Sequence, residues 1–126
     1  MEALFLRIAA ALGFSAVALG AFAAHGLKSR LSPEFLAIFE VGVRYQFYHA
    51  LALLALSLAP AALWQSRLTP AAGWAWIVGV LIFSGSLYLL ALTDTRWLGA
   101  ITPIGGVAFL AGWLLLFLAA GQLSAR

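Results

Sequence analysis

Long apolar segments alternate with short polar connections along this chain. Four stretches contain no Asp, Glu, Lys or Arg, and they cover residues 8–27, 45–66, 68–93 and 97–125. A helix needs about 20 mostly apolar residues to cross the roughly 30 Å hydrocarbon core of a bilayer, and each stretch is long enough. The pattern therefore predicts four membrane spans in a single domain that comprises residues 1–126.

A serine or threonine directly before a proline indicates where three of the helices begin. The pairs are Ser32-Pro33, Thr69-Pro70 and Thr102-Pro103. A Ser or Thr side chain accepts a bond from a free amide at a helix start, and proline fits the first helical position because its missing N–H would be unpaired there. With Pro60 as a stop signal, the sequence predicts helices at about 3–24, 33–59, 70–92 and 103–121.

The second predicted helix is longer than a membrane requires. At 1.5 Å per residue it would measure roughly 40 Å, against a hydrocarbon core of about 30 Å. We expect its start, which holds Glu34 and Glu40, to lie in the interface or to project from it, with Gly42 as a candidate break. The predicted fold class is an all-α integral membrane protein, an antiparallel four-helix transmembrane bundle with an extended or interfacial start to helix 2.

Composition agrees with this class. Hydrophobic residues make up 65% of the chain and charged residues 9%, far from the roughly 25% charged content of soluble domains. The absence of cysteine excludes disulfides, thiolate nucleophiles and thiolate metal sites. The net charge of +3 comes from scattered Lys and Arg without an aromatic-interleaved basic patch, so membrane lipids are the expected partners and nucleic acid is not.

The first apolar segment also resembles a cleavable secretory signal. Arg7 precedes it, and the small-residue triplet Ala21-Phe22-Ala23 could be a cleavage site. Against this interpretation, the apolar run continues to Ala24, and Ala16, Gly20 and Ala24 recur every four residues as a stripe suited to close helix packing in lipid. The segment is interpreted as a helix of the mature protein.

Antiparallel spans place the 1–2 and 3–4 connections on one membrane side, called the loop face here. The termini and the 2–3 connection then lie on the other side, the terminal face. Polar groups at membrane depth are costly unless they face the bundle interior or a water-filled cavity, so the pattern predicts a shallow polar pocket that opens at the loop face. Its hypothetical binding residues are His25, Glu40, Arg44, Tyr45, Tyr48, His49, Ser84, Ser86, Tyr88 and Thr102.

Two features of the second helix have alternative interpretations. Glu40 and Arg44 are four residues apart, the spacing at which opposite charges meet, and they form either an interfacial ion pair or part of an anion or headgroup site. His49 either makes a helix-to-helix hydrogen bond, for example with a hydroxyl of the third helix, or transfers protons or binds a ligand. Both alternatives stay open at this stage.

No catalytic site, cofactor or metal is predicted. His25 and His49 could both ligate one haem iron, but the layout places them at different depths. Two histidines without cysteine or nearby carboxylates are too few to provide the four protein ligands of a structural zinc site. Ser84-Gly85-Ser86 lacks the G-x-S-x-G pattern of a nucleophile elbow.

Four blocks in order resemble the YgdD/YwdK-like family of small uncharacterised bacterial inner-membrane proteins, a domain of unknown function. The blocks are Gly20-Ala21-Phe22-Ala23-Ala24-His25-Gly26-Leu27, Tyr45-Gln46-Phe47-Tyr48-His49-Ala50-Leu51, Phe83-Ser84-Gly85-Ser86-Leu87-Tyr88, and Thr102-Pro103-Ile104-Gly105-Gly106 with Phe109-Leu110-Ala111-Gly112-Trp113. The resemblance covers essentially the full length, and it implies four transmembrane helices and a cytoplasmic-membrane location. It supplies no activity, substrate or catalytic residue. Ala23 departs from the family pattern, in which glycine is usual.

Orientation depends on a nearly even count of basic residues. The loop face carries Lys28, Arg30, Arg44 and Arg96, and the terminal face carries Arg7, Arg67 and Arg126. Arg44 lies within a helix, which levels the count, and the basic tail and basic 2–3 connection favour a cytoplasmic terminal face. The predicted location is the bacterial inner membrane, multi-pass, with both termini in the cytoplasm.

Three functional classes fit these observations. The expected function is that of a non-enzymatic structural or accessory membrane protein, which forms a homo-oligomer or joins a larger membrane complex. The alternative is a lipid, quinone or amphiphile binding or transport protein that uses Arg44, Tyr45, His49 and Tyr88. A membrane enzyme with acid–base chemistry at His49 and Tyr48 is the third class, and we do not expect it.

Overall fold

The computed structural model describes residues 1–124, so Arg126, which entered the charge count, lies outside the described residues. Within them the chain forms helices and no strand. In chain order the elements are α1 (Glu2–Phe22), the π-helical η1 (Ala23–Leu27), α2 (Pro33–Ser57), α3 (Ala61–Trp64), α4 (Leu68–Gly79), the π-helical η2 (Val80–Ser84), α5 (Gly85–Thr93), the 3₁₀ helix η3 (Arg96–Ala100) and α6 (Thr102–Ser124).

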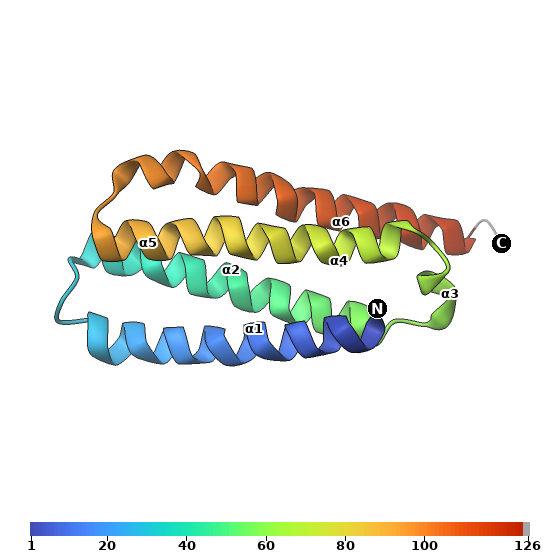
Figure 1. Ribbon diagram of the computed structural model, residues 1–126, viewed down its shortest axis with the longest axis horizontal. Coiled ribbons are helices and arrows are strands. Elements are labelled where there is room, and N and C mark those ends of the chain that lie inside the picture. The colour runs from blue at the N-terminus through green and yellow to red at the C-terminus, as the bar shows by residue number, and fades with distance from the viewer. Residues whose placement is uncertain (125–126) are drawn as a thin grey trace.

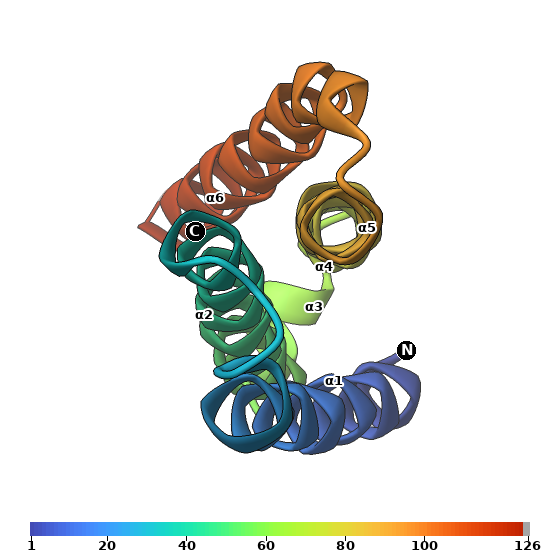
Figure 2. The ribbon, with the colours of Figure 1, turned by 90° about the vertical axis from the view of Figure 1, so that its left-hand side faces the viewer.

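Four long rods run side by side with alternating direction (Figure 1). The rods are α1 with η1, α2, α4–η2–α5, and α6 with η3. The connections of the loop face lie at one end of the rods, and the N-terminus and α3 lie at the other (Figure 1). Seen from the loop face, α2 lies between α1 and α6, and the α4–α5 rod completes the arrangement (Figure 2).

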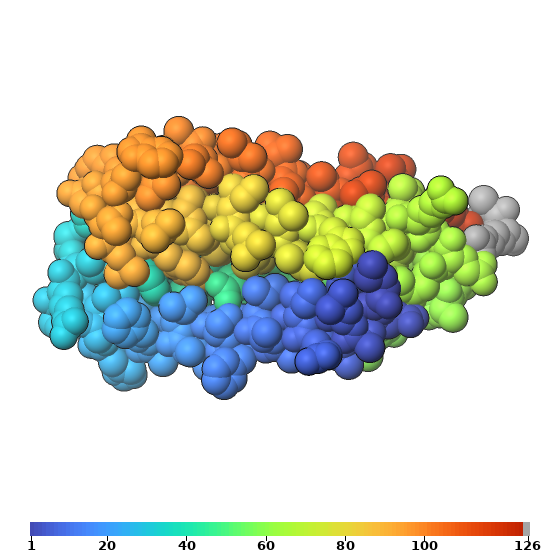
Figure 3. Space-filling model, viewed as in Figure 1, coloured from blue at the N-terminus to red at the C-terminus, as the bar shows by residue number. Residues whose placement is uncertain are grey.

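Packing is closest within two helical hairpins. The most extensive contacts join α1 to α2 and α4 to α6, while α2 also packs against η2, α5 and α4. The backbones of α2 and α6 approach each other at few points. On the face of the bundle formed by α1 and the α4–α5 rod, atoms of α2 are visible between these two rods (Figure 3). Near the terminal face that gap closes, because the Phe5 ring lies 5.5 Å from Trp74 of α4 between ring centroids.

The observed helix bounds differ from the predicted ones by up to three residues, as at Leu27 and Ser124, and the start of the third helix shows a different capping arrangement. The third helix begins at Leu68 rather than Pro70, and the Thr69 hydroxyl donates to the Leu63 carbonyl oxygen at 2.6 Å instead of capping. The N-cap position, Arg67, has no side-chain cap, and Ser66 just before it accepts from the amide of Leu68 at 3.2 Å through its Oγ. The cap at the second helix is present, with Ser32 Oγ accepting from the Phe35 amide at 3.2 Å.

Gly42, the candidate break, does not interrupt α2. The helix is continuous for 25 residues, roughly 37 Å, and Gly42 is buried where the third rod crosses it. A Cβ at this position would lie 2.8 Å from a ring carbon of Tyr88. Glycine therefore permits a close approach of helices here, the use that small residues have in membrane bundles.

Three segments are long and apolar enough to cross a membrane: Glu2–Leu27, Leu68–Thr93 and Arg96–Ser124. Within residues 1–124, α2 does not join this group, because its first half carries Glu34, Glu40 and Arg44 and polar side chains follow. The all-helical, multi-pass part of the predicted fold is thus confirmed. The fourth span stays a prediction.

Candidate functional site

Gln46 of α2 is buried, with 4% of its surface exposed, and connects three rods. Its Nε2 donates to the Leu12 carbonyl oxygen at 2.9 Å and to Ser15 Oγ at 2.7 Å, both on α1. Its Oε1 accepts from the Tyr88 hydroxyl at 2.7 Å. Sequence reasoning did not select Gln46, although an amide inside an apolar run is itself a signal of a partner across the bundle.

His49 is also buried, and both of its ring nitrogens have partners. Trp113 Nε1 lies 3.1 Å from His49 Nε2, and because an indole N–H can only donate, Nε2 must accept. The proton therefore resides on Nδ1, which donates to the Tyr45 carbonyl oxygen at 2.8 Å. The neutral imidazole stacks on Phe109 with ring centroids 3.7 Å apart. The interhelical partner is thus Trp113 of α6, not a hydroxyl of the third helix.

Two serines of the third rod connect it to its neighbours. Ser84 Oγ donates to the Gly42 carbonyl oxygen at 2.7 Å, which joins η2 to α2. Ser86 and Thr102 share a hydrogen bond of 2.6 Å, which joins α5 to α6. Among residues 1–124, neither serine hydrogen-bonds a histidine or a carboxylate, so neither has the base that a nucleophilic serine needs.

Other polar residues of α2 lie on its outward side. Glu40, Arg44 and Tyr48 follow one another at one-turn intervals and are called the α2 ridge here. Arg44 Nη2 lies 4.0 Å from Glu40 Oε2, and the two side chains are 60% and 42% exposed. Tyr45 lies beside the ridge and meets Tyr48 edge-on, with ring centroids 5.6 Å apart. The hydroxyls of Tyr45 and Tyr48 hydrogen-bond no other residue in the described part of the chain.

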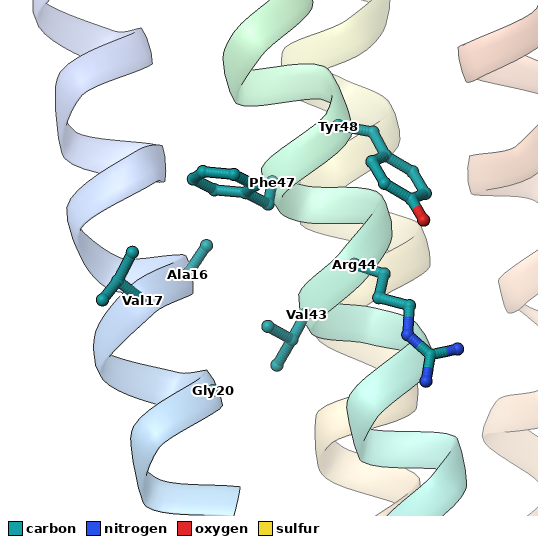
Figure 4. Close-up of a pocket in the computed structure, with 7 residues that line it drawn as sticks. All are labelled: Ala16, Val17, Gly20, Val43, Arg44, Phe47 and Tyr48. Carbon is teal, nitrogen blue, oxygen red and sulfur yellow. The ribbon is translucent and has the colours of Figure 1, made fainter.

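Two grooves flank the α2 ridge. The first lies between α1 and α2, has a volume of about 280 Å³ and presents only apolar atoms. It is lined by Ala16, Val17, Gly20, Val43, Arg44, Phe47 and Tyr48 (Figure 4). The second lies between α2 and α6 and measures about 450 Å³. Its lining consists of Tyr45, His49, Phe83, Pro103, Gly106, Val107, Phe109, Leu110 and Trp113. The Tyr45–Tyr48 ring pair forms the wall between the two grooves.

The predicted site residues are therefore distributed and do not converge on one cavity. Five of them connect helices: His49, Ser84, Ser86, Tyr88 and Thr102. Arg44 and Tyr48 line the first groove, and Tyr45 and His49 line the second. Glu40 lines neither groove and faces Arg44 on the outward side of α2. His25 stands alone on η1 as an exposed side chain at the loop face. Their role in binding stays a prediction.

A charged cluster at the loop face was not selected from the sequence. Arg96 lies 3.4 Å from Asp94 and 3.9 Å from Glu34, and its guanidinium stands 5.4 Å from the centre of the Phe35 ring. These contacts join η3 to the start of α2. All the charged groups are exposed, so the cluster stabilises the loop-face connections only modestly. Residues 1–124 hold no group of three or more His, Asp or Glu side chains placed to bind a metal ion.

Apolar helices of membrane-spanning length, with polar side chains used between them, define a multi-pass helical membrane protein. Residues 19–106 match the family described as "Protein of unknown function (DUF423)". The chain is 46% identical to a UPF0382 membrane protein of Staphylococcus haemolyticus over 115 residues, which are 91% of this chain and 93% of the relative.

Two further relatives are similarly close. Identity to the UPF0382 membrane protein YwdK of Bacillus subtilis is 41% over 92% of this chain and 94% of the relative. Identity to the UPF0382 membrane protein of Haemophilus influenzae is 43% over 90% of each chain. This chain belongs to the DUF423 family, to which the resemblance in its four sequence blocks pointed. No solved structure matches it.

Proposed function

We propose that this protein is a non-enzymatic accessory protein of the bacterial inner membrane with four spans, the fourth of which is α2. One observation carries the proposal: the buried polar side chains at the centre of the predicted site are engaged in bonds between helices. Gln46, His49 and Ser84 have their partners inside the bundle. Acid–base catalysis needs a proton donor or acceptor within reach of a substrate, and these groups are already occupied.

Both termini lie in the cytoplasm in this proposal. Arg67 in the 2–3 connection and Arg126 in the tail support the orientation, since basic residues in short connections favour the cytoplasmic side. The α2 ridge then faces the outer leaflet of the membrane. The length of α2, roughly 37 Å, exceeds the hydrocarbon core, so its charged start projects into the headgroup region.

A fluorophosphonate probe tests the absence of serine-based catalysis, because it phosphonylates serines that a neighbouring base activates. We expect purified protein in mild detergent to acquire no adduct, as intact mass spectrometry would show. Ser84→Ala serves as the control, since it removes the buried serine of η2. A stoichiometric adduct on the parent protein that is missing from Ser84→Ala would overturn the non-enzymatic proposal.

A second candidate function is the binding of a membrane amphiphile, and the two grooves beside the α2 ridge favour it. Tyr45 and His49 line the second groove and Arg44 borders the first, while Tyr88, the fourth residue of the predicted cluster, is turned inward to Gln46. Native mass spectrometry of gently extracted protein tests this candidate. We expect a retained small molecule, and a folded protein that carries none would contradict the binding function.

A further inference from the structure

We propose that the α2 ridge binds a zwitterionic phospholipid whose headgroup carries a phosphate and a primary ammonium group. Arg44 holds the phosphate, Glu40 holds the ammonium, and the two acyl chains occupy the grooves on either side of the ridge. This inference rests on the amphiphile-binding function proposed above and names its ligand class and its contacts.

The pairing of Arg44 with Glu40 leaves hydrogen-bonding groups of both side chains unused. A guanidinium offers five N–H donors, and a carboxylate accepts at two oxygens. Arg44 and Glu40 lie 4.0 Å apart, which is too long for a hydrogen bond, and both are substantially exposed. Charged groups on a membrane-facing surface are costly without partners, so the pair favours a ligand that carries both complementary charges.

The order of the groups along α2 matches the order of groups in such a lipid. α2 runs inward from the loop face, so Glu40 lies one turn, roughly 6 Å, nearer to water than Arg44. Phe47 and Tyr48 lie deeper than Arg44, and with Ala16 and Val17 of α1 they extend the first groove inward. From the outside inward the ridge therefore presents an acid, a base and an apolar groove. A phospholipid of this class presents an ammonium, a phosphate and acyl chains.

Tyr48 supplies a second donor near the phosphate position. Its hydroxyl and the Arg44 guanidinium both project to the side of α2 away from α1, and both point toward the N-terminal end of that helix (Figure 4). Hydrogen bonds from a cation to phosphate are among the stronger ones in proteins. A phosphate beside Arg44 would thus also have a neutral donor one turn further along the helix.

The two grooves account for two chains. They are separated by the Tyr45–Tyr48 ring pair, directly inward of Arg44. Glycines help to keep them open: Gly20 lines the first and Gly106 lines the second. A Cβ built at Gly106 meets its nearest atom, a ring carbon of Phe83, at 3.9 Å, so the space next to it is free.

Native mass spectrometry of the full chain, reconstituted with equimolar phosphatidylethanolamine and phosphatidylglycerol, tests the site. We expect the protein to retain phosphatidylethanolamine about tenfold over phosphatidylglycerol, a ratio that one extra charge contact supplies. Arg44→Gln should lower retention of both lipids about tenfold. Glu40→Gln should abolish or reverse the preference. Arg96→Gln is the matched control, since Arg96 is a loop-face arginine that lines neither groove, and it should change neither quantity.

Gly106→Leu tests the second groove without changing any charge. The added side chain fills the space beside Phe83, so retention of the two-chain lipid should fall while single-chain lysophosphatidylethanolamine still binds through the first groove. Equal loss of both lipids, or of neither, would contradict the assignment of one chain to each groove. Water-soluble phosphoethanolamine at millimolar concentration should displace nothing, and displacement would overturn the lipid assignment.

The outcomes separate this inference from the function on which it rests. A folded protein that retains no lipid overturns both. Lipid retention that is unchanged in Arg44→Gln would place the lipid elsewhere on the protein. That result would contradict this inference but not the amphiphile-binding function. A parent protein that prefers phosphatidylglycerol, or a Glu40→Gln variant with unaltered preference, overturns the headgroup assignment.

Discussion

Gln46 uses both N–H donors and the carbonyl oxygen of its amide inside the bundle. Its partners, Leu12, Ser15 and Tyr88, belong to two other rods, so one side chain fixes three helices relative to one another. In a lipid environment helix association gains little from the hydrophobic effect, and packing and interhelical hydrogen bonds contribute more. His49 acts in a similar way between α2 and α6.

Replacing this amide should destabilise the protein without altering its surface. We expect Gln46→Leu to lower the free energy of unfolding in detergent by about 1–2 kcal/mol, because three hydrogen bonds are lost and the Tyr88 hydroxyl is left buried. Unfolding in mixed micelles with increasing dodecyl sulfate measures this change. Gln122→Leu, an exposed amide of α6, is the matched control, and equal stability of the two variants would refute the bridging role.

At the residue scale the sequence indicates polar groups in apolar helices but not their partners. Each span is apolar on nearly every side, so the helical periodicity that would reveal an inward face is weak. The outward direction of Arg44 and the pairing of His49 with Trp113 could therefore not be predicted from the sequence. The i, i+4 relation of Glu40 and Arg44 was foreseeable, because it depends on local helix geometry alone.

At the scale of elements, glycine positions determine how closely the third and fourth rods pack. A Cβ at Gly105 of α6 would collide with the backbone of Phe83 in η2, and one at Gly79 would collide with the ring of Phe109. The backbone of Phe83 is fixed by its helix and cannot shift to accept a side chain at Gly105. A side chain at the adjacent Gly106, in contrast, would enter open space. Neighbouring glycines thus have different roles.

This difference can be measured with two alanine variants. Gly105→Ala should lower stability by about 1–3 kcal/mol, the usual cost of overpacking. Gly106→Ala should leave it unchanged or slightly higher, since alanine favours the helix over glycine. Thermal unfolding in a single detergent, followed by circular dichroism, makes the comparison. Tolerance of alanine at Gly105 would indicate that α6 packs differently from the described arrangement.

The helices themselves were largely predictable, because uncharged length and capping residues are local signals. The residues at which the helices begin and end were less predictable. Ser66 rather than Thr69 accepts from the first amide of the third rod, and Pro70 lies within its first turn, where proline is tolerated. The two π-helical segments, η1 and η2, also escaped prediction, since a widened turn depends on contacts with other helices.

At the scale of the whole molecule, the arrangement of four antiparallel rods leads us to expect that α2 crosses the membrane despite its polar first half. Charge-free stretches indicated four rods, and the structure places them in two hairpins joined mainly by α2. The pairing of hairpins had no signal in the sequence, because it depends on contacts between residues far apart in the chain, such as Ser84 with Gly42.

Single cysteines test this topology without background, since the chain has none. Ser29→Cys and Ala100→Cys, both exposed at the loop face, should react with a membrane-impermeant maleimide from one side of the membrane. Arg67→Cys in the 2–3 connection should react from the other. Reaction of all three from the same side would show that α2 does not span the bilayer.

The sparse backbone contact between α2 and α6 has a consequence for biogenesis. Each hairpin buries its closest interface within itself, and the hairpins meet where α2 packs on the α4–α5 rod and through directional bonds, among them those of Gln46 with Tyr88 and His49 with Trp113. We expect each pair of helices to leave the translocon as a preformed unit, with docking of the two units as a later event. Halves severed between Pro60 and Leu68 and synthesised separately should then reassemble in the bilayer.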